Sequence, residues 1–285
     1  MKKHNLFKSF LSIVLLSALS FSAEAAQVNL LSVHSESMNK DVNVVCVTPD
    51  IMDAGRRCPV IYLLHGYAAN QDAWLRIQPA LPRMADQYGV AFVTPDAKNS
   101  WYWDSPVNNS YRYETFVSKE LVEYIDAHFK TRPTRNFRAI TGLSMGGHGA
   151  FWLAIRHQDT FGAVGSMSGG LDIRPFPDNW EMKNQLGDYK FNKEVWDNHT
   201  VINQLDKLTE GALAITFDCG VDDFFFQVNE NVHKKLMEMK ISHDFTARPG
   251  AHTNEYWNNS LDYQIVFFHK FFQKSAQNSH KRVKK

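Results

Sequence analysis

Residues 142–146 hold the clearest chemical signal in the sequence, because they spell G-x-S-x-G around Ser144. A mostly apolar segment of strand character, 136–141, precedes this motif, and a helix-like segment rich in small residues, 147–155, follows it. A strand, a sharp turn and a helix in this order expose a serine hydroxyl as a nucleophile. A glycine-rich loop with an incidental serine is the alternative, which the flanking pattern disfavours. The motif therefore predicts a nucleophile elbow, residues 142–146, with Ser144 as the attacking group.

Such a serine needs a base, since a hydroxyl attacks an acyl carbon only when its proton is removed. That base is nearly always a histidine whose tautomer is fixed by a buried carboxylate. Of the twelve histidines, His252 occupies a glycine-flanked loop that follows a late predicted strand. The other eleven lie near the termini, before the elbow, in predicted helices, in a polar segment or at the start of a strand. We expect His252 to be the base.

Three carboxylates could orient that histidine. Asp222 and Asp223 come just after the end of a predicted strand, and Asp172 follows the strand after the elbow. Successive residues of an extended backbone point to opposite sides, so only one of Asp222 and Asp223 can face His252. The pattern does not say which, and each of the three could also be a turn or helix-capping carboxylate.

An early apolar run, residues 59–64, predicts a strand buried on both faces, as in a parallel sheet. The run ends in His65, Gly66 and Tyr67, where a loop could supply half of an oxyanion hole. The backbone N–H groups that would stabilise the oxyanion are those of Tyr67 and of Met145, the residue after the nucleophile. We interpret His65 as a hydrogen-bonded packing residue rather than as a base.

The elements that must position these residues alternate between strand and helix for most of the chain. This alternation predicts an α/β fold with a mostly parallel, doubly wound sheet and right-handed crossovers. Two strands within 28–47 predict an antiparallel edge at the N-terminal end of that sheet. The remaining predicted strands are 59–64, 90–96, 136–141, 161–168, 212–217 and 243–247.

Aromatic residues mark candidate walls of a binding pocket. Trp101 and Tyr102 lie in a loop that follows the strand 90–96, at the edge of the sheet where ligands bind in doubly wound folds. Trp257, five residues after His252, is a third candidate for substrate binding. The polar segment 169–209 interrupts the alternation and could cover the pocket. Surface packing is the alternative for the aromatic loop, and a structural flap for the polar segment.

The two ends of the sequence differ from its middle. Residues 1–25 combine a basic start, a short apolar stretch and the cleavage pattern Ala23-Glu24-Ala25, which predicts a signal peptide. The apolar stretch is too short for a membrane-spanning helix, so we expect an exported protein, periplasmic or secreted, with no stable membrane anchor. We expect residues 26–273 to form a single domain and residues 274–285 a basic, flexible tail.

Composition narrows the function classes. Hydrophobic residues make up 44% and charged residues 21%, as in ordinary globular proteins, and the formal net charge of +1 gives no indication of a nucleic-acid partner. The three cysteines have no metal-binding spacing, so we expect no metal, and the proposed chemistry needs no cofactor. Whether Cys46 and Cys58 pair, and whether the protein forms oligomers, stays open.

The ordered motifs around Ser144, His65, Asp223 and His252 together resemble a bacterial esterase family of α/β-hydrolases, over residues 29–272. That family includes tributyrin, feruloyl and acetyl-xylan esterases, S-formylglutathione hydrolases and mycolyltransferases. The resemblance implies that Asp223, the last position of a G-x-x-D segment, is the acid, and it supports Tyr67 and Met145 as oxyanion donors.

The activity implied is that of an exported serine carboxylesterase. Its substrates would be small-molecule or oligosaccharide esters, with short-chain acyl or feruloyl-type groups on carbohydrate derived from plant polysaccharides. An acyltransferase with the same three catalytic residues and an inactive carbohydrate-binding homologue are the alternatives.

Overall fold

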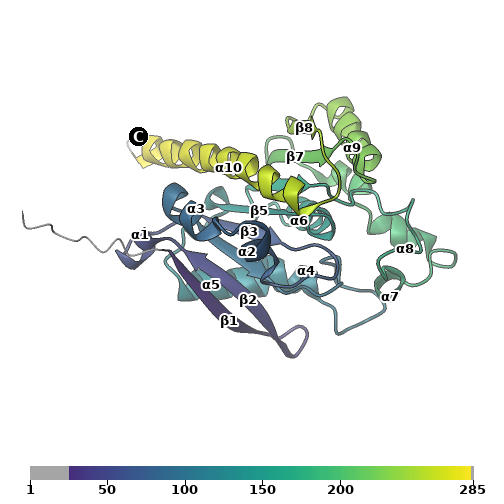
Figure 1. The fold of residues 1–285 in the computed structure, drawn as a ribbon, viewed down its shortest axis with the longest axis horizontal. Helices are drawn as coiled ribbons and strands as arrows, with labels where there is room; N and C mark the ends of the chain where they lie inside the picture. The colour runs from purple at the N-terminus through teal and green to yellow at the C-terminus, as the bar shows by residue number, and fades with distance from the viewer. Residues whose placement is uncertain (1–25, 284–285) are drawn as a thin grey trace, which may run out of the picture.

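Eight strands form one sheet in the computed structural model, which describes residues 26–283 (Figure 1). The strand order is β1-β2-β4-β3-β5-β6-β7-β8. Strands β4, β3, β5, β6, β7 and β8 run parallel, whereas β1 pairs with β2 and β2 with β4 in antiparallel fashion. The predicted α/β fold with an antiparallel N-terminal edge is thereby confirmed. The bounds are β1 Gln27–Ser35, β2 Lys40–Thr48, β3 Val60–Leu64, β4 Ala91–Pro95, β5 Arg138–Gly142, β6 Ala163–Met167, β7 Ala214–Gly220 and β8 Asp244–Arg248.

The central strands are mostly apolar because both faces of the sheet are covered. All residues of β3, β4, β5 and β6 are buried. Within β3, Tyr62 and Leu64 point into one core, while Ile61 and Leu63 point into the other. This alternation follows from the two-residue repeat of a strand.

Helices pack on both faces. On one face lie α2 (Ala73–Ile77), α3 (Leu81–Tyr88) and α10 (Asn254–Val283), which share a core with Ile61 and Leu63. The opposite core includes side chains of α5 (Leu121–His128), α6 (Met145–Arg156) and α9 (Phe226–Glu238). The shorter helical segments are α1 Asp50–Asp53, α4 Tyr113–Thr115, the π-helix η1 Phe116–Glu120 and the 3₁₀ turn η2 Arg135–Phe137.

The polar segment 169–209 contains only short helices, as expected for a connection outside the sheet. Figure 1 shows α7 and α8 to one side of the sheet, away from the end of α10 that carries the C-terminus. The helical pieces of the segment are α7 Lys183–Leu186, α8 Lys193–Asn198, η3 Val201–Asn203 and η4 Leu205–Lys207.

Where the sequence predicted a tail from residue 274, α10 continues as one helix to Val283. No proline or glycine occurs between residues 254 and 283, and the Lys, Gln, Ala and Ser residues of this stretch are compatible with a helix. The Ser279 hydroxyl donates to the carbonyl of Ser275, one turn earlier. The predicted signal peptide, residues 1–25, lies outside the described residues.

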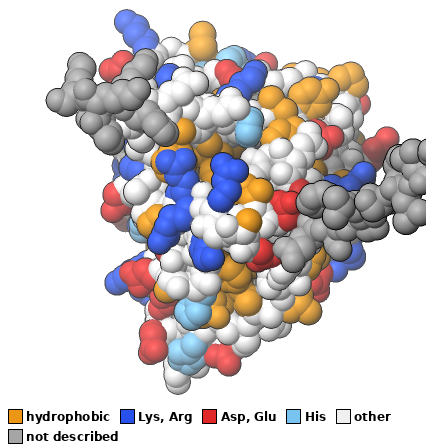
Figure 2. Space-filling view, turned by 90° about the vertical axis from the view of Figure 1, so that its left-hand side faces the viewer, with side chains coloured by type: hydrophobic (Ala, Val, Ile, Leu, Met, Phe, Trp, Pro, Cys, Tyr) orange, Lys and Arg blue, Asp and Glu red, His pale blue; other side chains and the backbone are white. Residues whose placement is uncertain are grey.

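The surface mixes charges of both signs. Figure 2 shows the side of the molecule on the left of Figure 1, where Lys and Arg side chains gather near the centre with Asp and Glu side chains around them. No helix within residues 26–283 combines the length and the apolar character needed to cross a bilayer. Cys46, Cys58 and Cys219 are all buried free thiols, so Cys46 and Cys58 do not pair.

Candidate active site

The elbow, residues 142–146, links β5 to α6 by a tight turn at Ser144. The Ser144 backbone has φ 56° and ψ −117°, a strained conformation for a residue with a side chain. Glycine is required on both sides of the serine. A Cβ atom at Gly142 would lie 2.5 Å from the carbonyl carbon of Gly146, and one at Gly146 would lie 2.3 Å from the Leu64 oxygen. Strand β5 and helix α6 can therefore cross this closely only because residues 142 and 146 have no side chain. The turn between them exposes the Ser144 hydroxyl to the pocket.

His252 and Asp223 continue from that hydroxyl as a chain of hydrogen bonds. The Nε2 atom of His252 lies 2.9 Å from the Ser144 Oγ atom, and its Nδ1 atom lies 2.8 Å from Asp223 Oδ2. The other carboxylate oxygen of Asp223 accepts the backbone N–H of Phe225 at 2.8 Å. The Asp223 side chain is fully buried, which excludes water from its bond to the histidine. The three residues have the geometry that lets a histidine take a proton from a serine.

The other two carboxylate candidates lie elsewhere. Asp222 is exposed, and its backbone N–H donates to the Gly250 carbonyl. Asp172 is held by the Arg174 guanidinium through contacts of 2.7 and 2.9 Å. The structure thus brings Asp223, and neither alternative, to His252.

A buried polar network ties together the elements that carry these three residues. Asp218 in β7 accepts hydrogen bonds from Ser260 and, at 2.8 Å, from Gln264, both in α10. Gln264 in turn accepts the hydroxyl of Thr141, three residues before Ser144, at 2.5 Å. Burial raises the pKa of the Asp218 carboxyl. Strands β5 and β7 and the helix after His252 are therefore fixed to one another behind the site.

Two backbone N–H groups next to Ser144 have no acceptor within the described part of the chain. They belong to Met145, the first residue of α6, and to Tyr67, in the loop after β3. The loop lies close to the nucleophile, because a Cβ atom at Gly66 would be 3.5 Å from the Ser144 Cβ. The start of α6 also carries the positive end of the helix dipole, which favours an anion.

A pocket of about 420 Å³ opens at Ser144 and His252. Its aromatic wall includes Trp180, Phe224 and Trp257, the last of which is the residue proposed from the sequence for substrate binding. Phe224 lies against the His252 ring at 4.3 Å between centroids and stacks on Trp180 at 5.7 Å. The remaining lining residues are Gly66, Tyr67, Ala69, Ala73, Arg76, Ile77, Leu143 and Asn254.

Trp101 and Tyr102 do not line this pocket, contrary to the prediction. Both side chains are buried, and both residues have positive φ, 55° and 62°. This left-handed backbone directs the two rings into the core beside the site. A Cβ atom at Gly149 in α6 would lie 2.3 Å from the Tyr102 ring, and one at Gly170 would lie 2.9 Å from the Trp101 ring. The aromatic loop therefore packs against the elbow helix and lies outside the pocket lining.

Trp180, Phe224 and Arg76 are pocket residues that the sequence did not reveal as such. Phe224 directly follows Asp223, which is the one signal that could have placed it beside the histidine. Trp180 lies in the polar segment 169–209, where only the general position over the sheet edge was predicted. Arg76 donates to the Asn70 side chain at 3.2 Å and has no carboxylate partner within the described residues.

Comparison with known proteins gives consistent relatives. Residues 35–268 match the family described as "Putative esterase". The chain is 25% identical over 253 residues to an acetyl esterase of Caldicellulosiruptor saccharolyticus, covering 81% of this chain and 94% of the relative. It is 36% identical over 162 residues to a diacylglycerol acyltransferase/mycolyltransferase of Mycobacterium leprae, covering 53% of this chain and 47% of the relative, so it spans about half the length of that protein.

A solved structure of a ferulic acid esterase superposes with a TM-score of 0.74 at 26% identity, covering 87% of this chain and 99% of the other. The family match covers most of the chain, and the sheet with its antiparallel N-terminal strands is that of the matched esterase structure. The chain therefore belongs to the esterase family of α/β-hydrolases and is an enzyme of the carboxylesterase class.

Proposed function

We propose that this protein is an exported serine carboxylesterase in which Ser144 is the nucleophile, His252 the general base and Asp223 the carboxylate that orients it. The observation that carries the proposal is the continuous chain of hydrogen bonds from Ser144 Oγ through His252 to Asp223, at 2.9 and 2.8 Å. Export is supported by the sequence of residues 1–25, with its basic start, apolar stretch and cleavage pattern.

In the first half of the reaction, Ser144 Oγ attacks the ester carbonyl carbon while its proton passes to His252 Nε2. The carbonyl oxygen becomes an oxyanion, which the N–H groups of Tyr67 and Met145 stabilise. Collapse of this tetrahedral intermediate breaks the bond to the alcohol, and the proton on His252 is transferred to the leaving alkoxide oxygen. An acyl-Ser144 ester and a free alcohol result.

In the second half, water replaces the alcohol. His252 takes a proton from the water as its oxygen attacks the acyl carbon, and the same two N–H groups stabilise the second oxyanion. The bond to Ser144 Oγ then breaks, and the proton returns from His252 to the serine. The carboxylic acid leaves and the enzyme is regenerated.

The proposed substrates are short-chain acyl or feruloyl-type esters on carbohydrate derived from plant polysaccharides. A pocket of about 420 Å³ suits a small acyl or phenolic group, and its aromatic side chains Trp180, Phe224 and Trp257 offer flat apolar faces. The relatives named an acetyl esterase and a ferulic acid esterase support the same substrate class.

An acyltransferase with the same residues is the second candidate, favoured by the similarity to a mycolyltransferase. It would present a sugar hydroxyl to the acyl-enzyme in place of water. The two candidates are separated by measuring how the acyl group partitions between hydrolysis and transfer as a sugar or simple alcohol is added.

A substrate panel tests the proposed esterase. Acetyl, butyryl and feruloyl esters of simple alcohols and of xylan-derived sugars are compared by kcat/KM. We expect hydrolysis of at least one class, and its loss in Ser144→Ala. Activity on none of them, although a fluorophosphonate labels Ser144, would contradict the polysaccharide-esterase proposal. Neither activity nor labelling would favour an inactive carbohydrate-binding homologue.

A further inference from the structure

We propose that His65 is a positioning residue that aims the Tyr67 N–H at the oxyanion by holding the carbonyl of Gly66. This inference rests on the proposed function, because it concerns the stabilisation of the tetrahedral intermediate formed at Ser144. The His65 side chain is buried and lies outside the pocket lining.

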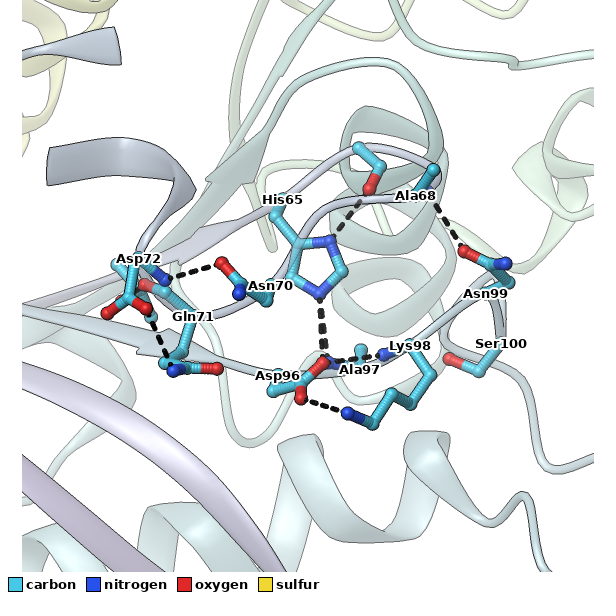
Figure 3. Close-up of polar contacts among 12 residues, drawn as sticks. His65, Ala68, Asn70, Gln71, Asp72, Asp96, Ala97, Lys98, Asn99 and Ser100 are labelled. Atoms are coloured by element: carbon cyan, nitrogen blue, oxygen red, sulfur yellow. Dashed lines mark hydrogen bonds and ion pairs between the residues drawn. The ribbon is translucent and has the colours of Figure 1, made fainter. Parts of the chain in front are cut away.

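The hydrogen bonds of the His65 ring fix its tautomer. Its Nε2 atom lies 2.9 Å from the backbone nitrogen of Ala97, which can only donate, so Nε2 is the acceptor (Figure 3). The proton of the neutral ring is therefore on Nδ1, which donates to the Gly66 carbonyl oxygen at 2.7 Å. Burial lowers the pKa of His65 and so favours this neutral form.

The Gly66 carbonyl belongs to the same peptide group as the Tyr67 N–H. In a trans peptide the C=O and N–H bonds point in opposite directions, and the described chain contains no cis peptide. A donor that fixes the carbonyl direction therefore fixes the N–H direction as well. The backbone N–H of Ala69 also donates to this carbonyl, at 3.3 Å. Two donors on the oxygen further polarise the peptide, which makes its N–H a better hydrogen-bond donor.

Residues of the loop after β4 hold His65 in place. The loop after β4 supplies the Ala97 N–H, and the Tyr102 hydroxyl donates to the His65 carbonyl at 3.0 Å. A second contact between the two loops joins the Ala68 N–H to the Asn99 side chain at 2.9 Å, as Figure 3 shows. Three hydrogen bonds thus join the loops after β3 and β4, in addition to the bond from the His65 ring to Gly66.

Two substitutions separate the two hydrogen bonds of the ring. In His65→Asn the amide nitrogen is at the position of Nδ1, so it can still donate to Gly66, but the acceptor for Ala97 is lost. In His65→Gln the amide is at the position of Nε2, so Ala97 keeps an acceptor and Gly66 loses its donor. Asn99→Ala is the matched control, because it removes another contact between the same loops and leaves the Gly66 peptide untouched.

The kinetics of 4-nitrophenyl acetate hydrolysis show whether His65 orients the Tyr67 N–H or only stabilises the fold. We expect kcat to fall about 10–100-fold in His65→Gln with little change in KM. A misdirected N–H loses its hydrogen bond to the oxyanion, which forms in the transition state and not in the bound substrate. His65→Asn and Asn99→Ala should stay within about threefold of wild-type kcat, a small effect on the scale of an oxyanion donor, whatever their melting temperatures. Inhibition by a trifluoromethyl ketone, which forms an oxyanion with the serine, should weaken by the same factor as kcat/KM in His65→Gln.

Wild-type kcat in His65→Gln, or losses of kcat that follow the melting temperature in all three variants, would overturn the inference. Nitrogen-15 NMR of the unmodified protein, labelled at histidine, gives a test that needs no variant: a proton on Nε2 of His65 would also overturn it. If the wild type hydrolyses no ester, or Ser144→Ala still does, the proposed function fails instead.

Discussion

At the scale of single residues, the site depends on which of two neighbouring aspartates turns inward. Asp223 is buried against His252, whereas Asp222 points to solvent, as expected for consecutive residues in a turn after a strand. The sequence narrowed the acid to three residues, and family resemblance favoured Asp223. Residue types alone could not show which neighbour faces His252, because this depends on the direction of the backbone after β7.

The first prediction uses this pair. Asp223→Asn should lower kcat/KM for 4-nitrophenyl acetate by about 10³–10⁴-fold, because an amide cannot stabilise the imidazolium and favours the wrong tautomer. Asp222→Asn removes the same charge one residue away and should stay within about twofold. Similar losses in the two variants would show that Asp223 has no special part in the reaction.

Arg76 gives a prediction about substrate charge. Besides His252, it is the one ionisable side chain of basic type in the pocket lining, and no carboxylate neutralises it within the described chain. The wild type should prefer the 4-nitrophenyl monoester of glutaric acid to 4-nitrophenyl pentanoate. Arg76→Gln should reduce that preference about tenfold, the effect of one charge-assisted hydrogen bond.

Arg83→Gln is the control for Arg76, since Arg83 is an exposed arginine of α3 that does not line the pocket. It should leave the ratio of kcat/KM values unchanged. An equal preference for both esters in the wild type would remove Arg76 from the account of specificity.

At the scale of elements, strand and helix cross so closely at the elbow that glycine is required. The sequence could predict this crossing, because the motif and its flanks are local. It could not predict the role of Trp101 and Tyr102, since nothing in a run of aromatic residues indicates the left-handed backbone that turns their rings inward. Nor did the basic composition of residues 274–285 reveal that α10 continues through most of them.

The crossing predicts the effect of a single methyl group. Gly146→Ala would place a Cβ atom 2.3 Å from the backbone oxygen of Leu64, which cannot move without breaking β3 from β5. We expect a loss of about 3 kcal/mol or more in the free energy of unfolding, measured by urea denaturation. Gly211→Ala, with no atom within 4 Å of the added Cβ but a φ of +69°, should cost about 1 kcal/mol. Equal costs would mean that the elbow adjusts easily.

At the scale of the whole molecule, the parallel sheet brings distant residues to one edge. Ser144 follows β5, Asp223 follows β7 and His252 follows β8, and the carboxyl ends of these parallel strands lie at one edge of the sheet, with β6 between β5 and β7. The alternation of apolar strands and helices was enough to predict this convergence. The pocket wall was less predictable, because Trp180 reaches it from the segment 169–209, which contains only short helices outside the sheet.

The buried histidines predict how stability depends on pH. Burial lowers the pKa of His148, on α6, from 6.5 to about 3. As the pH falls, His148 is therefore protonated in the unfolded chain before it is protonated in the folded chain. The free energy of unfolding is highest above pH 6.5 and decreases as the pH falls below this value. Between pH 7 and pH 4.5 this one group should cost the wild type up to about 3 kcal/mol.

His148→Gln tests this dependence. Whatever its stability at pH 7, the variant should lose less free energy of unfolding on acidification than the wild type, measured by urea denaturation at pH 7 and pH 4.5. His128→Gln, at an exposed position in α5, should behave as the wild type does. Parallel losses in wild type and His148→Gln would show that His148 titrates alike in the folded and unfolded chain.

Activation of Ser144 as a nucleophile by His252 is the step on which the proposed function depends. It is tested most directly by reaction with a fluorophosphonate, followed by peptide mass spectrometry and by the remaining hydrolysis of 4-nitrophenyl acetate. We predict one label per chain, on Ser144, with loss of activity in proportion to labelling, and labelling slower by at least about 10²-fold in His252→Ala. Labelling at another residue, or undiminished hydrolysis by Ser144→Ala, would contradict the account.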